Sequence, residues 1–133
     1  MFRRSKLEKL FNADEMLYET TKGDCKQWFK ILNREIFGSK LMKVDSWDIR
    51  WRRKTYAYYN FWDYVYHPEK NHSRICMNKR YKSKQFFVEI LAHEMIHHWQ
   101  QQNGFGDDFH GQTFFAWQQT FDEKGLTLAK GYE

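Results

Sequence analysis

Residues 93–97 read His-Glu-Met-Ile-His, and this spacing is chemically useful only if the stretch is helical. Positions four apart in a helix lie one turn apart on the same face, so His93 and His97 can direct imidazole nitrogens at one ion. Glu94 would then stand beside that ion, where it can take a proton from an attacking water molecule. On a helix, the H-E-x-x-H pattern is a signature of zinc hydrolases. The stretch therefore predicts a metal-binding helix around which the rest of the chain must fold.

The residues that flank the motif support this helix. Ser83 is a good N-cap, although the third residue after it is Phe86 rather than the Glu or Gln of a capping box. A stop signal follows at Asn103-Gly104. Between these ends, apolar residues at steps of three and four predict a core-facing stripe of Phe87, Ile90, Leu91, Met95 and Trp99. The alternative is an amphipathic surface helix that happens to be rich in His.

A catalytic zinc site usually has three protein ligands, so a third side chain is needed. The longer motif, with another His six residues after the second, is excluded because that position is Asn103. The leading candidate is His110, which follows a Gly-rich loop over 104–109. His98 lies about 100° around the helix from His97, which predicts a surface or supporting role. The competing ligands are the carboxylates of Asp107, Asp108 and Glu123.

The remaining hydrophobic patterns predict an α+β fold. Helical patterns occur over 3–20, from an N-cap at Asp24 to about Phe37, and over 112–124, while strand-like patterns occur over 44–52, 55–66 and 73–78. Gly38 and Gly125 are the expected stops of the second and last helices. Successive strands joined by short turns suggest a three-stranded antiparallel sheet, with helices before and after it. We expect residues 1–23 to form a helical extension and residues 24–133 to form a single compact domain.

The chain is basic, with a formal charge of +5 and a pI near 9.2. A basic domain of this size is attracted to polyanions, above all nucleic acid. Two stretches, 50–54 and 79–84, interleave cations with aromatic rings, which suits phosphates that pair with cations while bases stack on rings. The candidate contacts to single- or double-stranded DNA are Arg50, Trp51, Arg52, Arg53, Lys54, Lys79, Arg80, Tyr81 and Lys82. The alternative is a solvated sheet edge that Lys side chains protect from aggregation.

The sequence also indicates in which cellular compartment the protein is expected. No apolar run approaches the roughly 18 residues that span a membrane, and the first residues lack the apolar segment of a signal peptide. Cys25 and Cys76 form no C-x-x-C pair, so we interpret them as two free thiols in a reducing compartment. We expect a cytoplasmic monomer without membrane contacts, either nucleoid-associated or, if phage-encoded, in the cytoplasm of the host cell.

Five segments resemble, in the same order, the SprT-like zinc metalloproteases, the family that includes the Spartan proteases. The segments are 28–38, 47–51, 74–78, 91–97 and 110–114. The first three are similar to the family's first core helix, its first strand and the strand ahead of the metal helix, and the last two resemble its signature segments. The resemblance covers about residues 27–122. The chain departs from the family pattern at Ala57, where we would expect Gly, and it carries no Cys-based zinc ribbon.

The resemblance implies one catalytic Zn²⁺ held by His93, His97 and His110, with Glu94 as the general base and acid. The implied substrate is protein, and the family's connection with DNA extends this expectation to proteins that are associated with or crosslinked to DNA. The first alternative is a non-catalytic DNA-binding domain with a structural metal, which would have four protein ligands. The second is a metal hydrolase that acts on a non-peptide bond.

Overall fold

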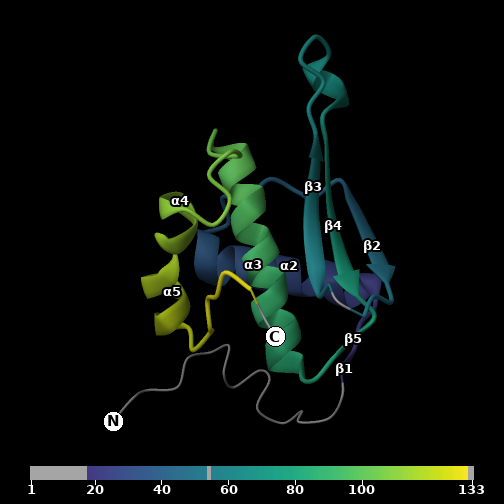
Figure 1. The fold of residues 1–133 in the computed structure, drawn as a ribbon, viewed down its shortest axis with the longest axis vertical. Coiled ribbons are helices and arrows are strands. Elements are labelled where there is room, and N and C mark those ends of the chain that lie inside the picture. The colour runs from purple at the N-terminus through teal and green to yellow at the C-terminus, as the bar shows by residue number, and fades with distance from the viewer. Residues whose placement is uncertain (1–17, 54, 132–133) are drawn as a thin grey trace.

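The helix that carries the His93–His97 motif, α3 (Lys84–Gln102), stands at the centre of the fold (Figure 1). The computed structural model describes residues 18–53 and 55–131. Ser83 caps α3 as predicted, because its hydroxyl oxygen accepts a hydrogen bond of 3.1 Å from the N–H of Phe86. Buried residues occupy nearly every side of α3 rather than one stripe. The reason is that a sheet covers one side of the helix, while α2 and α4 pack against others.

The sheet contains β2 (Ser46–Arg50), β3 (Ala57–Trp62) and β4 (His72–Asn78), in the order β2-β4-β3. β3 and β4 form an antiparallel hairpin, whereas β2 and β4 are parallel. The prediction of a purely antiparallel sheet is therefore wrong, and the sheet is mixed. β4 is the most buried of the three strands, as expected for the central strand, which has a neighbour on both edges.

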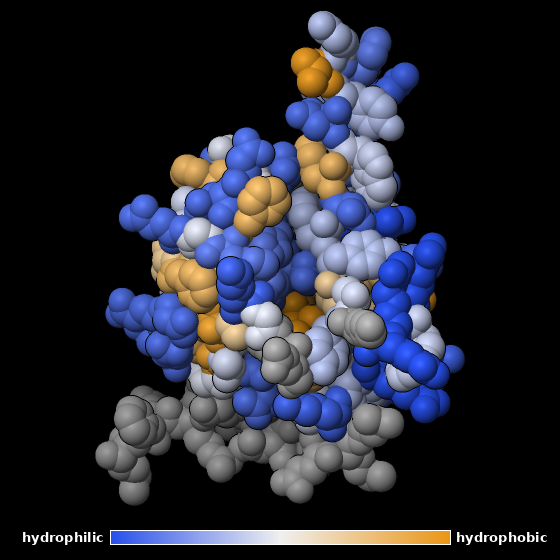
Figure 2. Space-filling model, in the orientation of Figure 1, coloured by the Kyte–Doolittle hydropathy of each residue, from blue (hydrophilic) through white to orange (hydrophobic). Residues whose placement is uncertain are grey.

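The β3–β4 hairpin extends beyond the body of the molecule (Figure 1), and a 3-10 helix, η1 (Pro68–Lys70), lies in the turn at its tip. Figure 2 shows the same hairpin as an arm that stands clear of the remaining surface. Exposed apolar side chains at this tip belong to Tyr64, Val65 and Tyr66. The predicted strands over 55–66 and 73–78 are thus found, but β3 is shorter than expected.

The N-terminal region differs from the prediction. Most of the predicted helix over 3–20 lies outside the described residues, but β1 (Tyr18–Glu19) is a strand that pairs antiparallel with β5 (Arg80–Tyr81). The helix prediction is wrong for these two residues because pairing with a distant strand overrides local periodicity. The ring of Tyr18 also stacks on Phe87 of α3, with centroids 4.9 Å apart.

The second helix, α2 (Lys22–Phe37), begins before the predicted N-cap. Thr21 is the cap, since its hydroxyl oxygen accepts a hydrogen bond of 3.1 Å from the N–H of Asp24. Asp24 instead lies in the first turn, where a carboxylate interacts favourably with the positive end of the helix dipole. The helix ends at Gly38 as predicted, with a left-handed φ of 61° that glycine adopts without strain.

The predicted helix over 112–124 is divided into α4 (Gln112–Phe115) and α5 (Gln118–Glu123). The break lies at Trp117, whose ring packs 4.6 Å from Phe37 and 5.2 Å from Trp99 between centroids. Both helices are anchored in the core by fully buried Phe114 and Phe121. Among the described residues, no helix combines the length and the apolar character that crossing a membrane requires.

Candidate metal centre

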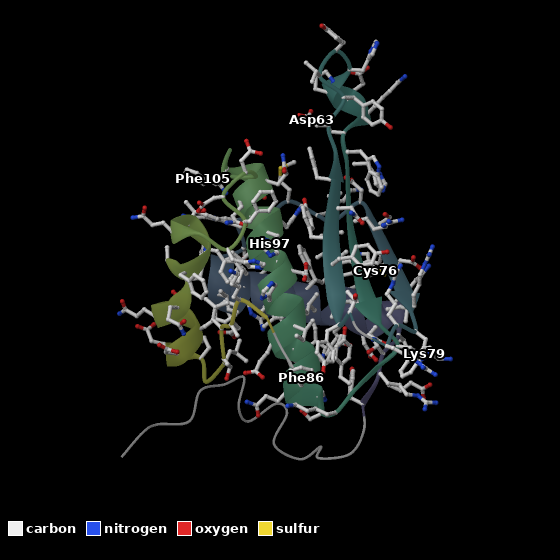
Figure 3. All side chains as sticks on the ribbon, viewed as in Figure 1. Asp63, Cys76, Lys79, Phe86, His97 and Phe105 are labelled. Carbon is white, nitrogen blue, oxygen red and sulfur yellow. The ribbon has the colours of Figure 1, made fainter. Side chains whose placement is uncertain are left out.

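Three histidines meet beside the middle of α3, at the site where Figure 3 labels His97. α3 places His93 and His97 one turn apart, and the loop before α4 brings His110 against them. Nε2 of His93 lies 3.3 Å from Nε2 of His97 and 3.2 Å from Nε2 of His110. Within residues 18–53 and 55–131, these three side chains are the one group of potential ligands whose donor atoms all lie within 4.8 Å of one another.

The spacing of the nitrogens fits a zinc ion. A tetrahedral zinc with bonds to nitrogen of about 2.0–2.1 Å sets neighbouring nitrogens about 3.3–3.4 Å apart. The observed separations of 3.2 and 3.3 Å match that value. The ligands must also be neutral, because a protonated imidazole has no lone pair to give. The donor set therefore suits zinc in both geometry and chemistry.

The surroundings keep all three imidazoles neutral. The pKa of His93 is lowered to about 3, mainly by burial and further by the neighbouring His97 and His110, against a hydrogen bond with the backbone of Ala129 that raises it. Burial also lowers the pKa of His97 and, together with the charge of Lys130, that of His110. At neutral pH the centre thus offers three unprotonated nitrogens to a metal.

The competing carboxylates are not brought to this centre. Asp108 is engaged at the start of α4, where its Oδ2 accepts a hydrogen bond of 2.7 Å from the N–H of Thr113 and another from the hydroxyl of that residue. These hydrogen bonds lower the pKa of Asp108 and hold its carboxylate against Thr113 of α4. Asp107 and Glu123 are exposed to solvent, and neither joins the group of three histidines.

Glu94 lies beside the ligands and lines the same cleft. Its side chain is almost fully buried, and burial raises its pKa to about 8. A carboxyl group with a pKa near neutrality can both accept and release a proton at physiological pH. The predicted general base therefore lies beside the three histidines, and burial favours its neutral form in the metal-free protein.

A cleft of about 580 Å³ runs between α3 and β3 and contains all three histidines. One wall is made by residues of the β3 region, among them the aromatic residues Tyr56, Tyr59 and Phe61. Phe109, which directly precedes His110, and Lys130, from the segment after α5, also line the cleft. β3 is an edge strand of its sheet, so the cleft lies along a sheet edge.

His98 has a supporting role rather than a place on the surface. Its Nε2 lies 2.7 Å from the backbone oxygen of Met42, and its Nδ1 lies 2.9 Å from the hydroxyl of Tyr59. Because a carbonyl oxygen can only accept, Nε2 carries the proton and Nδ1 accepts the hydrogen bond of Tyr59. This buried imidazole therefore fastens the cleft wall of β3 to α3.

The two predicted basic stretches meet at one end of the sheet. β2 and β4 run parallel with Arg50 opposite Asn78, so the residues that follow each strand lie side by side. The side chain of Asn78 joins them, donating a hydrogen bond of 2.8 Å to the backbone oxygen of Arg52. The candidate contacts that are exposed here are Arg50, Trp51, Arg52, Arg53, Lys79, Arg80 and Lys82. Figure 3 labels Lys79 at this end, and Lys54 lies outside the described residues.

The prediction that Tyr81 contacts nucleic acid is wrong. Its side chain is only 2% exposed, and its hydroxyl accepts a hydrogen bond from the N–H of Asn78 and donates one to the backbone oxygen of Tyr56. A core ring with a bonded hydroxyl cannot stack on a base. The sequence reasoning also missed Tyr58, which lies beneath the guanidinium of Arg52 at 5.0 Å, because the register of 55–66 could not be assigned.

The main residue that sequence reasoning missed at the metal centre is Gln100, whose Oε1 lies 2.9 Å from Nδ1 of His97. Its spacing was a usable signal, since a residue three positions after a ligand lies on the same face of the helix. Ala129, which forms a hydrogen bond with His93 through its backbone, gave no comparable signal because backbone groups are common to all residues.

Comparisons with known proteins agree with this architecture. None of the curated proteins compared with the chain matches it. A family model described as the SprT-like family matches residues 25–131, a span that includes α2, the mixed sheet, α3 and the His110 loop. Since this match covers most of the chain, the protein belongs to the SprT-like family.

Proposed function

We propose that this protein is a zinc metallopeptidase that hydrolyses peptide bonds. The observation that carries the proposal is the convergence of three histidine Nε2 atoms, at 3.2 and 3.3 Å, beside a buried carboxyl in an open cleft. Membership of the SprT-like family supports it, because that family is associated with metallopeptidase-like function. A structural zinc would call for a fourth protein ligand. In the part of the chain that the structure describes, the ligand group contains three.

In this proposal the residues of the cleft have different roles. His93, His97 and His110 would hold the ion, which supplies a Lewis acid that polarises the peptide carbonyl and lowers the pKa of water. Glu94 accepts the proton of the attacking water and returns it to the leaving amine. The edge of β3 offers backbone groups with which an extended peptide can pair.

The first test is the zinc content of protein purified without added metal. We expect about one zinc per chain in the parent and in Glu94→Gln, and much less in His110→Ala. Only the parent should then cleave an unfolded protein substrate. His67→Ala is the control, since this histidine is exposed at the hairpin and lies outside the ligand group. Full activity of Glu94→Gln would remove the mechanism, and activity on a panel of esters but not peptides would favour another hydrolase.

We further propose that the substrates include proteins associated with nucleic acid. The observation behind this is the meeting of the two basic stretches, and Figure 2 shows hydrophilic residues gathered over that end of the sheet. The first stretch leads into Thr55, which lines the cleft. Cations there could hold phosphates while the cleft receives the attached protein.

The test is the affinity for single- and double-stranded DNA as a function of salt concentration. Phosphate contacts require a steep fall in affinity with salt, and the triple variant with Arg52, Arg53 and Lys79 changed to Ala should flatten it. The control removes the same charge from exposed positions of α2, by changing Lys22, Lys26 and Lys30 to Ala. If both triple variants bind DNA alike, the basic end of the sheet is not the contact.

A further inference from the structure

We propose that Gln100 is a positioning residue that ties the two metal-binding segments of the chain together. One end of its amide fixes the tautomer of His97, and the other end holds the loop that presents His110. Gln100 lies on α3 three residues after His97, and its side chain is 1% exposed. The inference rests on the metal-binding part of the proposed function and is independent of the bond that is hydrolysed.

The orientation of the amide follows from its partners. The nitrogen of Gln100 lies 2.8 Å from the backbone oxygen of Phe109, which can only accept a hydrogen bond, so this end of the amide is the NH₂ group. Oε1 therefore faces Nδ1 of His97 at 2.9 Å and requires a proton there. A neutral imidazole protonated at Nδ1 has its lone pair on Nε2, which is the atom that lies near His93.

The same amide acts on the third ligand through the backbone. Phe109 directly precedes His110 and has a φ of 49°, a left-handed conformation that residues other than glycine seldom adopt. The hydrogen bond from Gln100 to the carbonyl oxygen of Phe109 helps hold this strained residue in place. The direction in which His110 leaves the loop depends on that conformation.

A second hydrogen bond connects Gln100 with the far end of the loop. Its nitrogen lies 3.1 Å from the hydroxyl oxygen of Thr113, which accepts because the hydroxyl hydrogen is donated to Asp108. Asp108 and Thr113 thus close the turn around His110, and Gln100 fastens the closed turn to α3. The hydrogen bonds run from His97 through one buried amide to both ends of the turn, with each donor matched to an acceptor.

Two substitutions test the hydrogen bonds at the two ends of the amide separately. Gln100→Leu removes both, and Gln100→Glu keeps an acceptor for His97 but loses the donor to Phe109 and Thr113. Loss of such supporting partners typically weakens metal affinity by about 10–100-fold. We expect a loss in that range for zinc and for Co²⁺ with either variant, together with an altered visible spectrum of bound Co²⁺.

The matched control is Gln102→Leu on the same helix. Gln102 also ties a loop to α3, accepting a hydrogen bond of 2.7 Å from the N–H of Met42 and donating one to the oxygen of Lys40. Among the described residues, its hydrogen bonds go to this loop and not to a histidine of the centre. We expect this variant to lose stability yet bind zinc and Co²⁺ like the parent. Thermal unfolding of the metal-free proteins measures that loss separately from the affinity.

Nitrogen NMR of the imidazoles gives a readout without metal or activity. We expect His97 to carry its proton on Nδ1 in the metal-free parent, in Gln100→Glu and in Gln102→Leu, and to become a mixture of tautomers in Gln100→Leu. Metal affinity of Gln100→Leu equal to that of Gln102→Leu, or a His97 of the parent protonated at Nε2, would overturn the inference. A parent that takes up no metal would overturn the proposed function instead, and the tautomer would still decide the role of Gln100.

Discussion

Asp108 occupies the space into which a Cβ atom at Gly111 would project. The backbone oxygen of Asp108 lies 2.9 Å from that position, and the carboxylate lies closer still. The carboxylate cannot simply move away, because its Oδ2 accepts a hydrogen bond of 2.7 Å from the N–H of Thr113 in α4. The absence of a side chain at Gly111 therefore permits the tight turn that presents His110.

Replacing Gly111 with Ala should disturb this turn. We expect a loss of about 1–3 kcal/mol in the free energy of unfolding, since overpacking against the backbone must be relieved by movement, and a weaker zinc affinity because His110 moves with the turn. Denaturant unfolding of the metal-free protein and a zinc titration measure the two effects. Gly23→Ala is the control, because its Cβ would meet only the Thr21 hydroxyl oxygen at an ordinary 3.7 Å. Equal behaviour of both variants would contradict the steric argument.

The hydroxyl of Tyr59 should stabilise the fold through His98. Tyr59→Phe leaves the buried Nδ1 of His98 without its donor, so we expect a loss of about 1–3 kcal/mol in the free energy of unfolding. Tyr66→Phe should have an effect within about 0.5 kcal/mol, because Tyr66 is 91% exposed at the hairpin tip. Equilibrium unfolding in urea compares the two, and a Tyr59→Phe protein as stable as the parent would show that His98 finds another partner.

The pKa of Glu94 predicts how the stability of the metal-free protein depends on pH. Burial raises this pKa from 4.5 to about 8, so the folded state holds the proton more tightly than the unfolded state does. The contribution of Glu94 is therefore fully present below pH 4.5 and is lost as the pH rises towards 8. His93, with its pKa lowered from 6.5 to about 3, acts in the opposite sense and loses its contribution as the pH falls between these values.

Glu94→Gln should remove the pH dependence of stability that arises from Glu94 and leave the one that arises from His93. Relative to this variant, we expect the parent to lose on the order of a few kcal/mol in the free energy of unfolding as the pH rises through that window. The measurement is urea unfolding in the presence of a chelator at a series of pH values. Parallel stability curves for the two proteins would mean that Glu94 is not held in its neutral form.

Zinc should stabilise the folded state by an amount that rises with the logarithm of its free concentration. At a free concentration about 100 times the dissociation constant, the expected gain in unfolding free energy is about 2.7 kcal/mol. Glu94→Gln should keep this gain, and His110→Ala should lose most of it. Mg²⁺, which prefers oxygen ligands, is the control ion. A shift in the unfolding temperature with Mg²⁺ as large as that with zinc would point to a site of different chemistry.

Local spacing in the sequence was enough to predict α3, its cap at Ser83, and the placing of His93 and His97 on one face. These features depend on helical geometry, which residues a few positions apart determine among themselves. The meeting with His110 could also be predicted, because a short loop limits where that imidazole can go and zinc chemistry favours a third nitrogen ligand. The motif and its family resemblance thus came from the sequence by itself.

The tertiary structure decided what depends on contacts between distant segments. It placed β4 at the centre of a mixed sheet, buried Tyr81, turned residues 18–19 into a strand and selected Gln100 as the link between two ligands. The physical reason is that strand order and burial follow from the competition of all segments for one core. A window of a few residues does not include the distant segments that compete for the core. The geometry of a helix turn, in contrast, is determined by residues within that window.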